Sequence, residues 1–132
     1  MNISVIWPQN AYDENQFDYV LSNFKSDKVY VLGDFQCTHK VLRDAPRISS
    51  GQEIEENFPI VLLAPSSMRN YKPTIQLQDF EHPPDAIYVF GPNNLNLDGF
   101  EPDYIVEIPT DTDDEMFNYV SYAVTMWHRR YG

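Results

Sequence analysis

The stretch AIYVFGPNNLNLDGFEPDYIVEIPTDTDDEMFNYVSYAVTMWHRR, residues 86–130, decides the fold of this chain. It predicts a short apolar strand over 86–90, a loop over 91–100, a second strand over 104–107, and a closing helix. Ligands of open α/β sheets bind beyond the carboxyl ends of the strands. The loops that follow these two strands therefore form the candidate functional site.

The remaining sequence supplies the other strands and helices of the domain. Apolar runs predict strands over 3–7, 28–32, 59–63 and, at a sheet edge, 74–77. An apolar stripe from Phe17 to Phe24 predicts a helix that begins near Asp13, which forms a capping-box pattern with Gln16. Two strands joined by a helix within about 30 residues favour parallel pairing. We predict one α/β domain over residues 1–132, with a mostly parallel sheet and helices on both faces.

The closing helix has a predicted start and a predicted buried face. Thr112 and Glu115 have the spacing of a capping box, so the helix is expected to begin there. At 3.6 residues per turn, one face gathers apolar side chains and is predicted to be buried. That face consists of Met116, Phe117, Val120, Ala123, Val124 and Trp127. The opposite face, with Asn118, Ser121, Thr125 and His128, is either solvated or lines a site or a subunit interface.

Composition restricts the function. Only 9 basic residues stand against 20 acidic ones, and the net charge of -11 disfavours nucleic acid as a partner, because proteins that bind phosphates usually carry basic patches. Cys37 is the one cysteine, which excludes an internal disulfide and a multi-cysteine metal site. No run approaches the roughly 20 apolar residues of a membrane span, and no secretion signal opens the sequence. We expect a cytoplasmic protein without a metal site or membrane segment.

Several short motifs, in consistent order and spacing, resemble those of one protein family. FGPNN at 90–94 resembles an F-G-[NP]-E loop, and IP at 108–109 resembles an I-P-M loop. MFN at 116–118, followed without a gap by the last helix, is similar to an S-L-N helix start. ISVIWPQ at 3–9, with Asn15, is similar to a strand, P-[EQ] and N-x-G-x-I-x-R. Together they resemble the SpoU/TrmH-type branch of the SPOUT superfamily, the RNA 2'-O-ribose methyltransferases.

The resemblance implies a fold, a cofactor and an assembly. The fold is an α/β domain with a C-terminal trefoil knot, formed by the loop over 91–100 and the loop over 108–114. The cofactor is S-adenosylmethionine, and the assembly is a homodimer, joined through the C-terminal helix, with active sites built from both subunits. The implied cofactor-binding residues are Leu63, Ala64, Phe90, Gly91, Pro92, Asn93, Ile108, Pro109, Thr110, Phe117 and Asn118. The implied catalytic residues are Asn15 and Asn118.

Three positions depart from the family pattern. Leu21 stands where the family has the Arg that activates the ribose hydroxyl, Asn93 stands for a Glu, and Met116 for a Ser. Methyl transfer needs alignment of the reacting groups, but the attacking hydroxyl must also lose a proton. Either some other group assists, for which the candidates are His128 and Arg129, or the protein only binds the ligand.

Two functions follow from this resemblance, and one lies outside it. The first is an S-adenosylmethionine-dependent methyltransferase of transfer or ribosomal RNA, divergent at its catalytic positions. The second is a catalytically silent dimeric SPOUT-like module that serves in binding or regulation. The sequence leaves open whether a protein partner supplies the missing positive surface. The third is an unrelated flavodoxin-like or receiver-like domain, for which Asp34 alone provides too few acidic residues at the strand ends.

Overall fold

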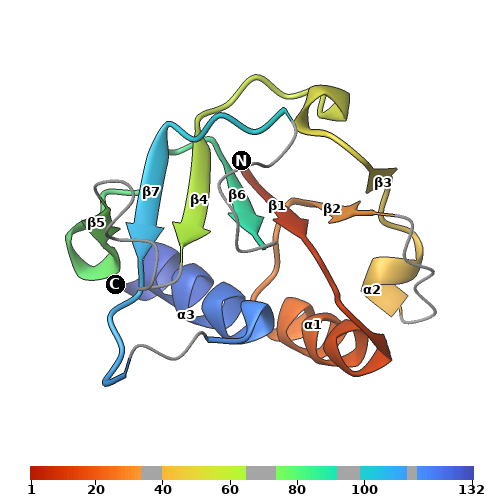
Figure 1. Cartoon of the computed structure of the whole chain (residues 1–132), viewed down its shortest axis with the longest axis horizontal. Coiled ribbons are helices and arrows are strands. Elements are labelled where there is room, and N and C mark those ends of the chain that lie inside the picture. The colour runs from red at the N-terminus through yellow and green to blue at the C-terminus, as the bar shows by residue number, and fades with distance from the viewer. Residues whose placement is uncertain (34–39, 65–73, 92–98, 113–115) are drawn as a thin grey trace.

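A computed structural model describes residues 1–33, 40–64, 74–91, 99–112 and 116–132, and these form an α/β domain with a parallel sheet (Figure 1). The sheet has seven strands in the order β3-β2-β1-β6-β4-β7-β5. The strands are β1 (Asn2–Ile6), β2 (Lys28–Leu32), β3 (Arg47–Ile48), β4 (Ile60–Ala64), β5 (Ile75–Gln76), β6 (Ala86–Phe90) and β7 (Tyr104–Glu107). Every neighbouring pair is parallel, as the sequence predicted for most of the sheet.

The three α-helices of the described residues cover one face of the sheet. They are α1 (Ala11–Asn23), α2 (Lys40–Arg43) and α3 (Asn118–Tyr131). Leu21, Leu42 and Tyr122 bring them into one core cluster with alternate residues of the strands. The other face buries a second cluster around Val5, with Phe100 and the segment that contains the 3-10 helix η1 (Gly51–Glu53) near it. We predicted helices on both faces, but within the described ranges the α-helices cover only one face of the sheet.

The burial of the central strands explains why their sequences are continuous apolar runs. All five residues of β1 and of β6 are buried, because both strands lie inside the sheet and side chains alternate between its two faces. The predicted bounds of β2, β6 and β7 are confirmed, and β5 is confirmed as an edge strand.

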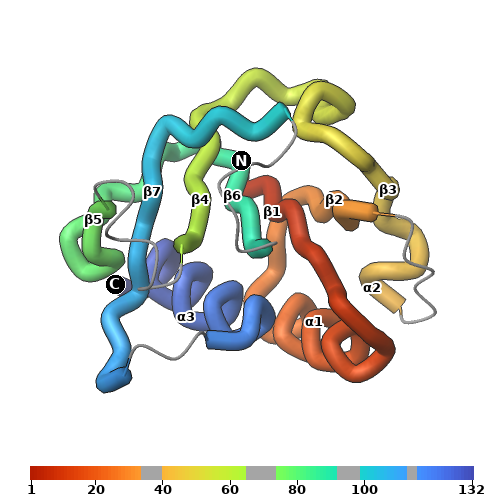
Figure 2. The backbone as a smooth tube through the Cα atoms, in the orientation of Figure 1, coloured from red at the N-terminus to blue at the C-terminus, as the bar shows by residue number. Residues whose placement is uncertain are grey.

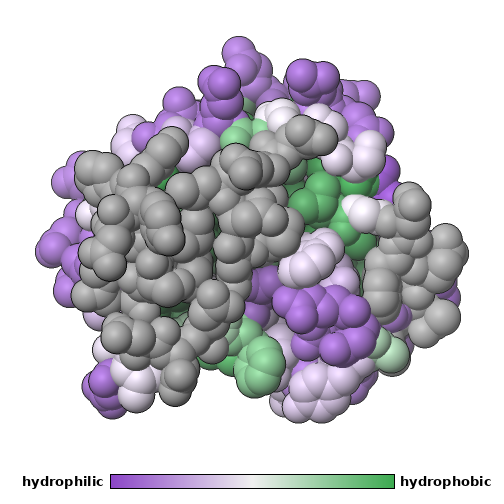
Figure 3. All heavy atoms as spheres, viewed as in Figure 1, coloured by the Kyte–Doolittle hydropathy of each residue, from purple (hydrophilic) through white to green (hydrophobic). Residues whose placement is uncertain are grey.

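Figure 2 traces the backbone through the strands and helices of the domain. Figure 3 shows hydrophobic residues gathered near β2 and β3 on the side turned to the viewer.

Helix α1 begins earlier than predicted. Its N-cap is Asn10, whose Oδ1 accepts a hydrogen bond from the Asp13 backbone N–H at 2.9 Å. Asn is among the strongest N-cap residues, and it prevails over the capping box expected at Asp13. The predicted apolar stripe is confirmed, since Phe17 and Leu21 are buried.

Helix α3 begins later than predicted and turns a different face to the core. Its N-cap is Phe117, without a side-chain cap, whereas Thr112 lies in a bend and Glu115 lies outside the described residues. The buried residues are Tyr122, Thr125 and Met126, and Trp127 of the predicted face is 52% exposed. The predicted buried face of this helix was wrong because the pattern left out Tyr122 and Thr125, which it counted as polar.

Tyr122 sets the face of α3 because its polar tip has partners inside the domain. The hydroxyl donates to the Phe24 carbonyl at 2.5 Å and lies 2.7 Å from Ser26 Oγ. Its ring meets the edge of Phe90 at 5.2 Å between centroids. A phenol satisfied in this way can bury its whole ring, and burial raises the pKa of Tyr122 to about 12. None of the described helices is long and apolar enough to span a membrane.

Candidate functional site

The ends of β6, β4 and β7 lie next to each other in the sheet. β4 pairs with β6 on one side and with β7 on the other, with Leu62 opposite Val89 and Ala64 opposite Glu107. All three strands are parallel, so their carboxyl ends share one edge of the sheet (Figure 1). The exits predicted to form the site, after residues 64, 90 and 107, are therefore neighbours. This is the edge where open α/β sheets bind their ligands.

The end of β6 meets the first residue of α3. Gly91 adopts a φ of +76°, in the left-handed region that favours glycine. A Cβ added at Gly91 would lie 2.2 Å from Asn118 Nδ2, so the Asn118 amide fills the space that a side chain would need. Asn118 opens α3, whose first N–H groups carry the positive end of the helix dipole. The contact places a side-chain amide and a helix N-terminus at the strand ends.

The other predicted cofactor-binding residues differ in exposure. Leu63, Ala64 and Phe90 are buried at the ends of β4 and β6, and Leu63 and Phe90 belong to the core cluster on the helix side of the sheet. Ile108 is partly buried against the same core cluster, while Pro109 and Thr110 are exposed in the turn after β7.

Phe117 is 65% exposed, and its ring stacks on Tyr119 with centroids 5.5 Å apart. Pro92 and Asn93 lie outside the described residues, as do parts of both loops of the expected trefoil knot. The knot therefore stays a prediction.

Glu107 is a site residue that the sequence reading missed. It ends β7, it is 1% exposed, and its Oε2 accepts hydrogen bonds from Thr74 Oγ1 at 3.0 Å and Gln76 Nε2 at 3.3 Å. These bonds hold the edge strand β5 against β7. The signal in the sequence was an acidic residue that directly follows an apolar strand core.

The predicted catalytic residues Asn15 and Asn118 occupy different surroundings. Asn118 lies at the strand ends, as described above. Asn15 is exposed on α1, and no hydrogen bond among the described residues connects it to Gly91 or Asn118. Leu21, in the position of the family Arg, is 2% exposed inside the core. Met116 precedes α3 and is partly exposed.

His128 and Arg129, the predicted substitutes for the family Arg, belong to a cluster at the far end of α3. His82 Nδ1 lies 2.7 Å from the Tyr88 hydroxyl, and His82 Nε2 lies 2.8 Å from His128 Nδ1. Arg129 donates to the Tyr88 hydroxyl at 2.8 Å and to the carbonyls of residues 83 and 84. Burial, with smaller effects of the His128 and Arg129 charges, lowers the pKa of His82 to about 4.

This cluster is remote from the strand ends. Eleven residues separate Asn118 from Arg129, which corresponds to about 16 Å along a helix. The hydrogen bonds of Arg129 join α3 to the connection before β6, at the amino-terminal edge of the sheet. The cluster therefore fastens the end of α3 and lies away from Gly91 and Asn118 of the same chain.

A comparison with solved structures finds a protein of similar fold. The chain superimposes on the structure of a probable methylase family protein from Haemophilus influenzae Rd KW20 with a TM-score of 0.67 and 11% sequence identity. The match covers 97% of this chain and 64% of the other, so this chain spans somewhat less than two thirds of that protein. No family model and no curated protein matches the sequence. At this identity the likeness establishes a shared fold.

Proposed function

We propose that this chain binds S-adenosylmethionine at the shared ends of β4, β6 and β7, as a divergent relative of RNA 2'-O-ribose methyltransferases. The observation that carries the proposal is the contact of Gly91 with Asn118, which joins the β6 exit to the start of α3. Of the motif residues, Phe90 and Gly91 lie at the end of β6, Ile108 and Pro109 follow β7, and Asn118 begins α3. The shared fold with a probable methylase family protein supports the same assignment.

The residues at this edge fit such a cofactor. The strands end in the apolar residues Leu63, Ala64 and Phe90, next to the place where an adenine ring would lie. Backbone groups beyond the last sheet hydrogen bonds can read the polar edge of adenine, and Gly91 lets a ligand approach the chain closely. The Asn118 amide can both donate and accept a hydrogen bond. When bound, S-adenosylmethionine supplies an electrophilic methyl group on its sulfonium.

The burial of Leu21 favours a second candidate function. In it, the protein is a catalytically silent module that retains the fold and still binds the ligand. The position of the family Arg is inside the core, so this chain holds no guanidinium there to help deprotonate a ribose hydroxyl. A net charge of -11 also opposes encounter with the phosphates of RNA.

Calorimetric titration with S-adenosylmethionine tests the binding that both candidates share. Saturable binding with one site per chain is expected. The matched titration with adenosine, which lacks the sulfonium and the amino-acid part, should bind more weakly. A flat titration with S-adenosylmethionine would overturn both candidates and leave the strand ends without an assigned ligand.

The isolated protein is expected to methylate bulk RNA very weakly or not at all. One general acid or base group contributes about 10²- to 10⁴-fold to a rate, and the family Arg is replaced by buried Leu21. The measurement is transfer of labelled methyl groups from S-adenosylmethionine to transfer and ribosomal RNA, with a TrmH-type enzyme as the positive control. Robust transfer by the protein alone would contradict the silent module and show that another residue has taken over the role.

We also propose that the protein is a homodimer joined through α3. The exposed large apolar residues of this helix and its N-cap are Phe117, Val124, Trp127 and Tyr131. They are spaced 7, 3 and 4 residues apart, which places them along one stripe of the helix. An apolar stripe of this length on a helix is typical of a surface that another protein covers. A second copy of the chain provides an identical stripe for a two-fold contact.

Light scattering is expected to give twice the chain mass of 15.4 kDa at micromolar concentration. Trp127→Gln should shift the mass toward the monomer, because aromatic residues contribute most to such interfaces. Tyr19→Gln is the matched control, since Tyr19 is 68% exposed on α1, away from the α3 stripe. A monomer of the unchanged protein would contradict the dimer.

A further inference from the structure

The cluster that fastens the end of α3 has a defined direction of hydrogen bonding. Arg129 Nη1 donates to the Tyr88 hydroxyl at 2.8 Å, and a guanidinium can only donate. Tyr88 is buried, and among the described residues the acceptor within reach of its own proton is His82 Nδ1, at 2.7 Å. His82 Nδ1 is therefore an acceptor, and the proton of the neutral ring lies on Nε2.

The same direction continues from His82 into α3. His82 Nε2 carries the proton, so it donates to His128 Nδ1 at 2.8 Å. His128 in turn keeps its own proton on Nε2. The donors thus run from Arg129 through Tyr88 and His82 to His128, and this chain begins and ends on α3. In this arrangement neither imidazole can take up another proton without breaking one of its hydrogen bonds.

The surroundings of His82 offer no anion to compensate a proton. The charges that act on the ring are those of His128 and Arg129 on α3, and neither histidine forms an ion pair in the described part of the chain. The ring of Phe80 packs edge-on against His82, with centroids 4.9 Å apart. The remaining titratable groups of the surrounding elements, none of which has a hydrogen bond to either ring, are Asp79, Glu81 and Asp85 of the connection before β6, the Met1 amino group and Tyr104.

Burial opposes a charge on His82 as well. Together with the charges of His128 and Arg129, it lowers the pKa of His82 to about 4. A histidine in an unfolded segment has a pKa of about 6.5, so the released state binds this proton more readily than the folded one. The stability that the neutral ring contributes is therefore complete above pH 6.5 and is lost as the pH falls toward 4.

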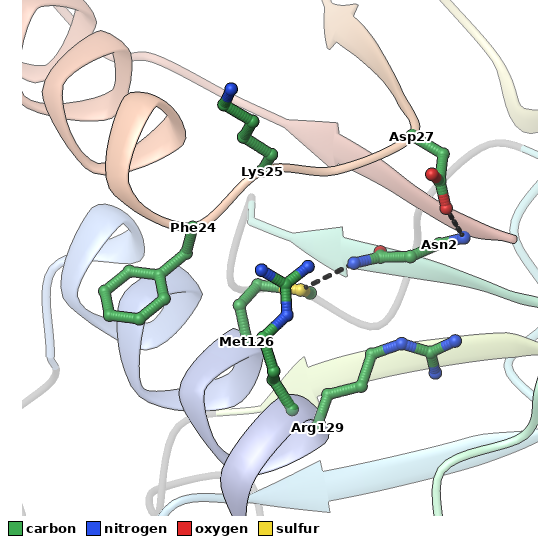
Figure 4. A pocket seen from close by; sticks show the side chains of 7 residues that line it. Asn2, Phe24, Lys25, Asp27, Met126 and Arg129 are labelled. Atoms are coloured by element: carbon green, nitrogen blue, oxygen red, sulfur yellow. Dashed lines mark hydrogen bonds between the residues drawn. The ribbon is translucent and has the colours of Figure 1, made fainter.

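The preceding turns of α3 are held by groups that do not titrate in this range. Met126 Sδ accepts a hydrogen bond from Asn2 Nδ2 at 3.0 Å, beside a small pocket that Arg129 also lines (Figure 4). One turn earlier, the Tyr122 hydroxyl donates to the Phe24 carbonyl. A break in the histidine cluster therefore leaves the helix fastened as far as Met126, and only residues 127–131 are freed.

We propose that the His82–His128 pair is an acid-sensitive clasp, which releases the last turns of α3 when one of the two rings takes up a proton. A proton on His82 Nδ1 displaces the bond from Tyr88, and a proton on His128 Nδ1 displaces the bond from His82. Either one also adds a positive charge close to the Arg129 guanidinium. The rest of the domain stays folded, because its contacts are not involved. The clasp consists of contacts within one chain, so it does not depend on the proposed dimer or cofactor.

The first test uses the unchanged, ¹⁵N-labelled full chain and NMR. At pH 7 the imidazole spectra should show the proton of His82 and that of His128 on Nε2. Between pH 6.5 and pH 4.5, amide hydrogen exchange should show protection factors at residues 127–131 that fall by up to about 10-fold per pH unit, the limit for one proton. The amides of Tyr122 and of β6 should keep theirs.

Two variants separate the clasp from the titration of other groups. His82→Gln keeps one acceptor and one donor on a planar group that does not titrate, so the pH dependence at the end of α3 should disappear. His39→Gln is the matched control. His39 is the third histidine of the sequence, it lies outside the described residues, and it takes no part in these hydrogen bonds. This variant should retain the pH dependence of the unchanged protein.

Three results would overturn the proposal. They are a proton on His82 Nδ1 at pH 7, protection at residues 127–131 that does not change with pH, and an equal loss of the pH dependence in His82→Gln and His39→Gln. The first two are measured on the unchanged protein, so the test stays decisive if His82→Gln does not fold.

Discussion

Leu21→Arg is expected to destabilise the domain by about 4 kcal/mol or more, enough to unfold a typical small protein. Leu21 is 2% exposed and packs in the core cluster that also contains Phe17 and Leu42. A guanidinium there would be removed from water among apolar neighbours, at a cost far above that of a cavity. Urea unfolding followed by circular dichroism measures the loss.

The matched control is Leu21→Met, which keeps the volume and should cost less than about 1.5 kcal/mol. The comparison bears directly on function, because the substitution to Arg restores the residue of the family at this position. A stable Leu21→Arg variant that also gained methyl transfer to RNA would show that position 21 reaches the site, contrary to its burial here. Unfolding would mean that the chain cannot regain that catalytic group by one substitution.

Gly91→Ala is expected to lower the affinity for S-adenosylmethionine by about 100-fold, or roughly 2.7 kcal/mol. The new Cβ would meet Asn118 Nδ2 at 2.2 Å, so the amide must leave its place at the end of β6. The positive φ of Gly91 adds about 1–2 kcal/mol of backbone strain. Calorimetry with the ligand and thermal unfolding without it measure the two effects separately.

Gly33→Ala is the control for backbone strain. Gly33 has a φ of +103°, and no described atom lies within 4 Å of a Cβ added there. This variant should lose only the part of the stability that is due to strain, about 1–2 kcal/mol, and keep its ligand affinity. The double variant Gly91→Ala with Asn118→Ala should regain part of the stability, because the displaced amide is gone, but not the affinity. Unchanged affinity in Gly91→Ala would place the ligand away from the end of β6.

The sequence predicted those strands and helices whose buried residues are also the apolar ones. Strands β2, β6 and β7 lie at their predicted bounds, and β1 and β4 lie one residue from theirs, because buried parallel strands appear in the sequence as apolar runs. The orientation of α3 could not be predicted in this way. It depends on Tyr122, whose hydroxyl pairs with the Phe24 carbonyl, nearly a hundred residues earlier in the chain. Periodicity treats such a residue as polar surface and cannot register a partner so distant in sequence.

The candidate site was predictable in its location but not in its contacts. Neighbouring strand exits follow from the rule for parallel sheets, and residues 63–64, 90–91 and 108 do lie at one edge. The approach of Asn118 to Gly91 depends on where α3 begins, which the acidic segment before it obscured. The small pocket lined by Asn2, Lys25 and Arg130 at the opposite edge of the sheet was not predictable either, because only the tertiary fold brings these residues together.

The pairing of β1 with β6 has a consequence for how the chain folds during synthesis. Asn2 lies opposite Ala86, a separation of 84 residues, and these two strands form the middle of the sheet. Until β6 has left the ribosome, β1 has a partner only on the side of β2, and its other edge is open to unwanted pairing. Helix α3, which follows β6 in the chain, packs against β6 and contacts Asn2 of β1 through Met126. The domain therefore closes late, at a rate limited by contacts between distant parts of the chain.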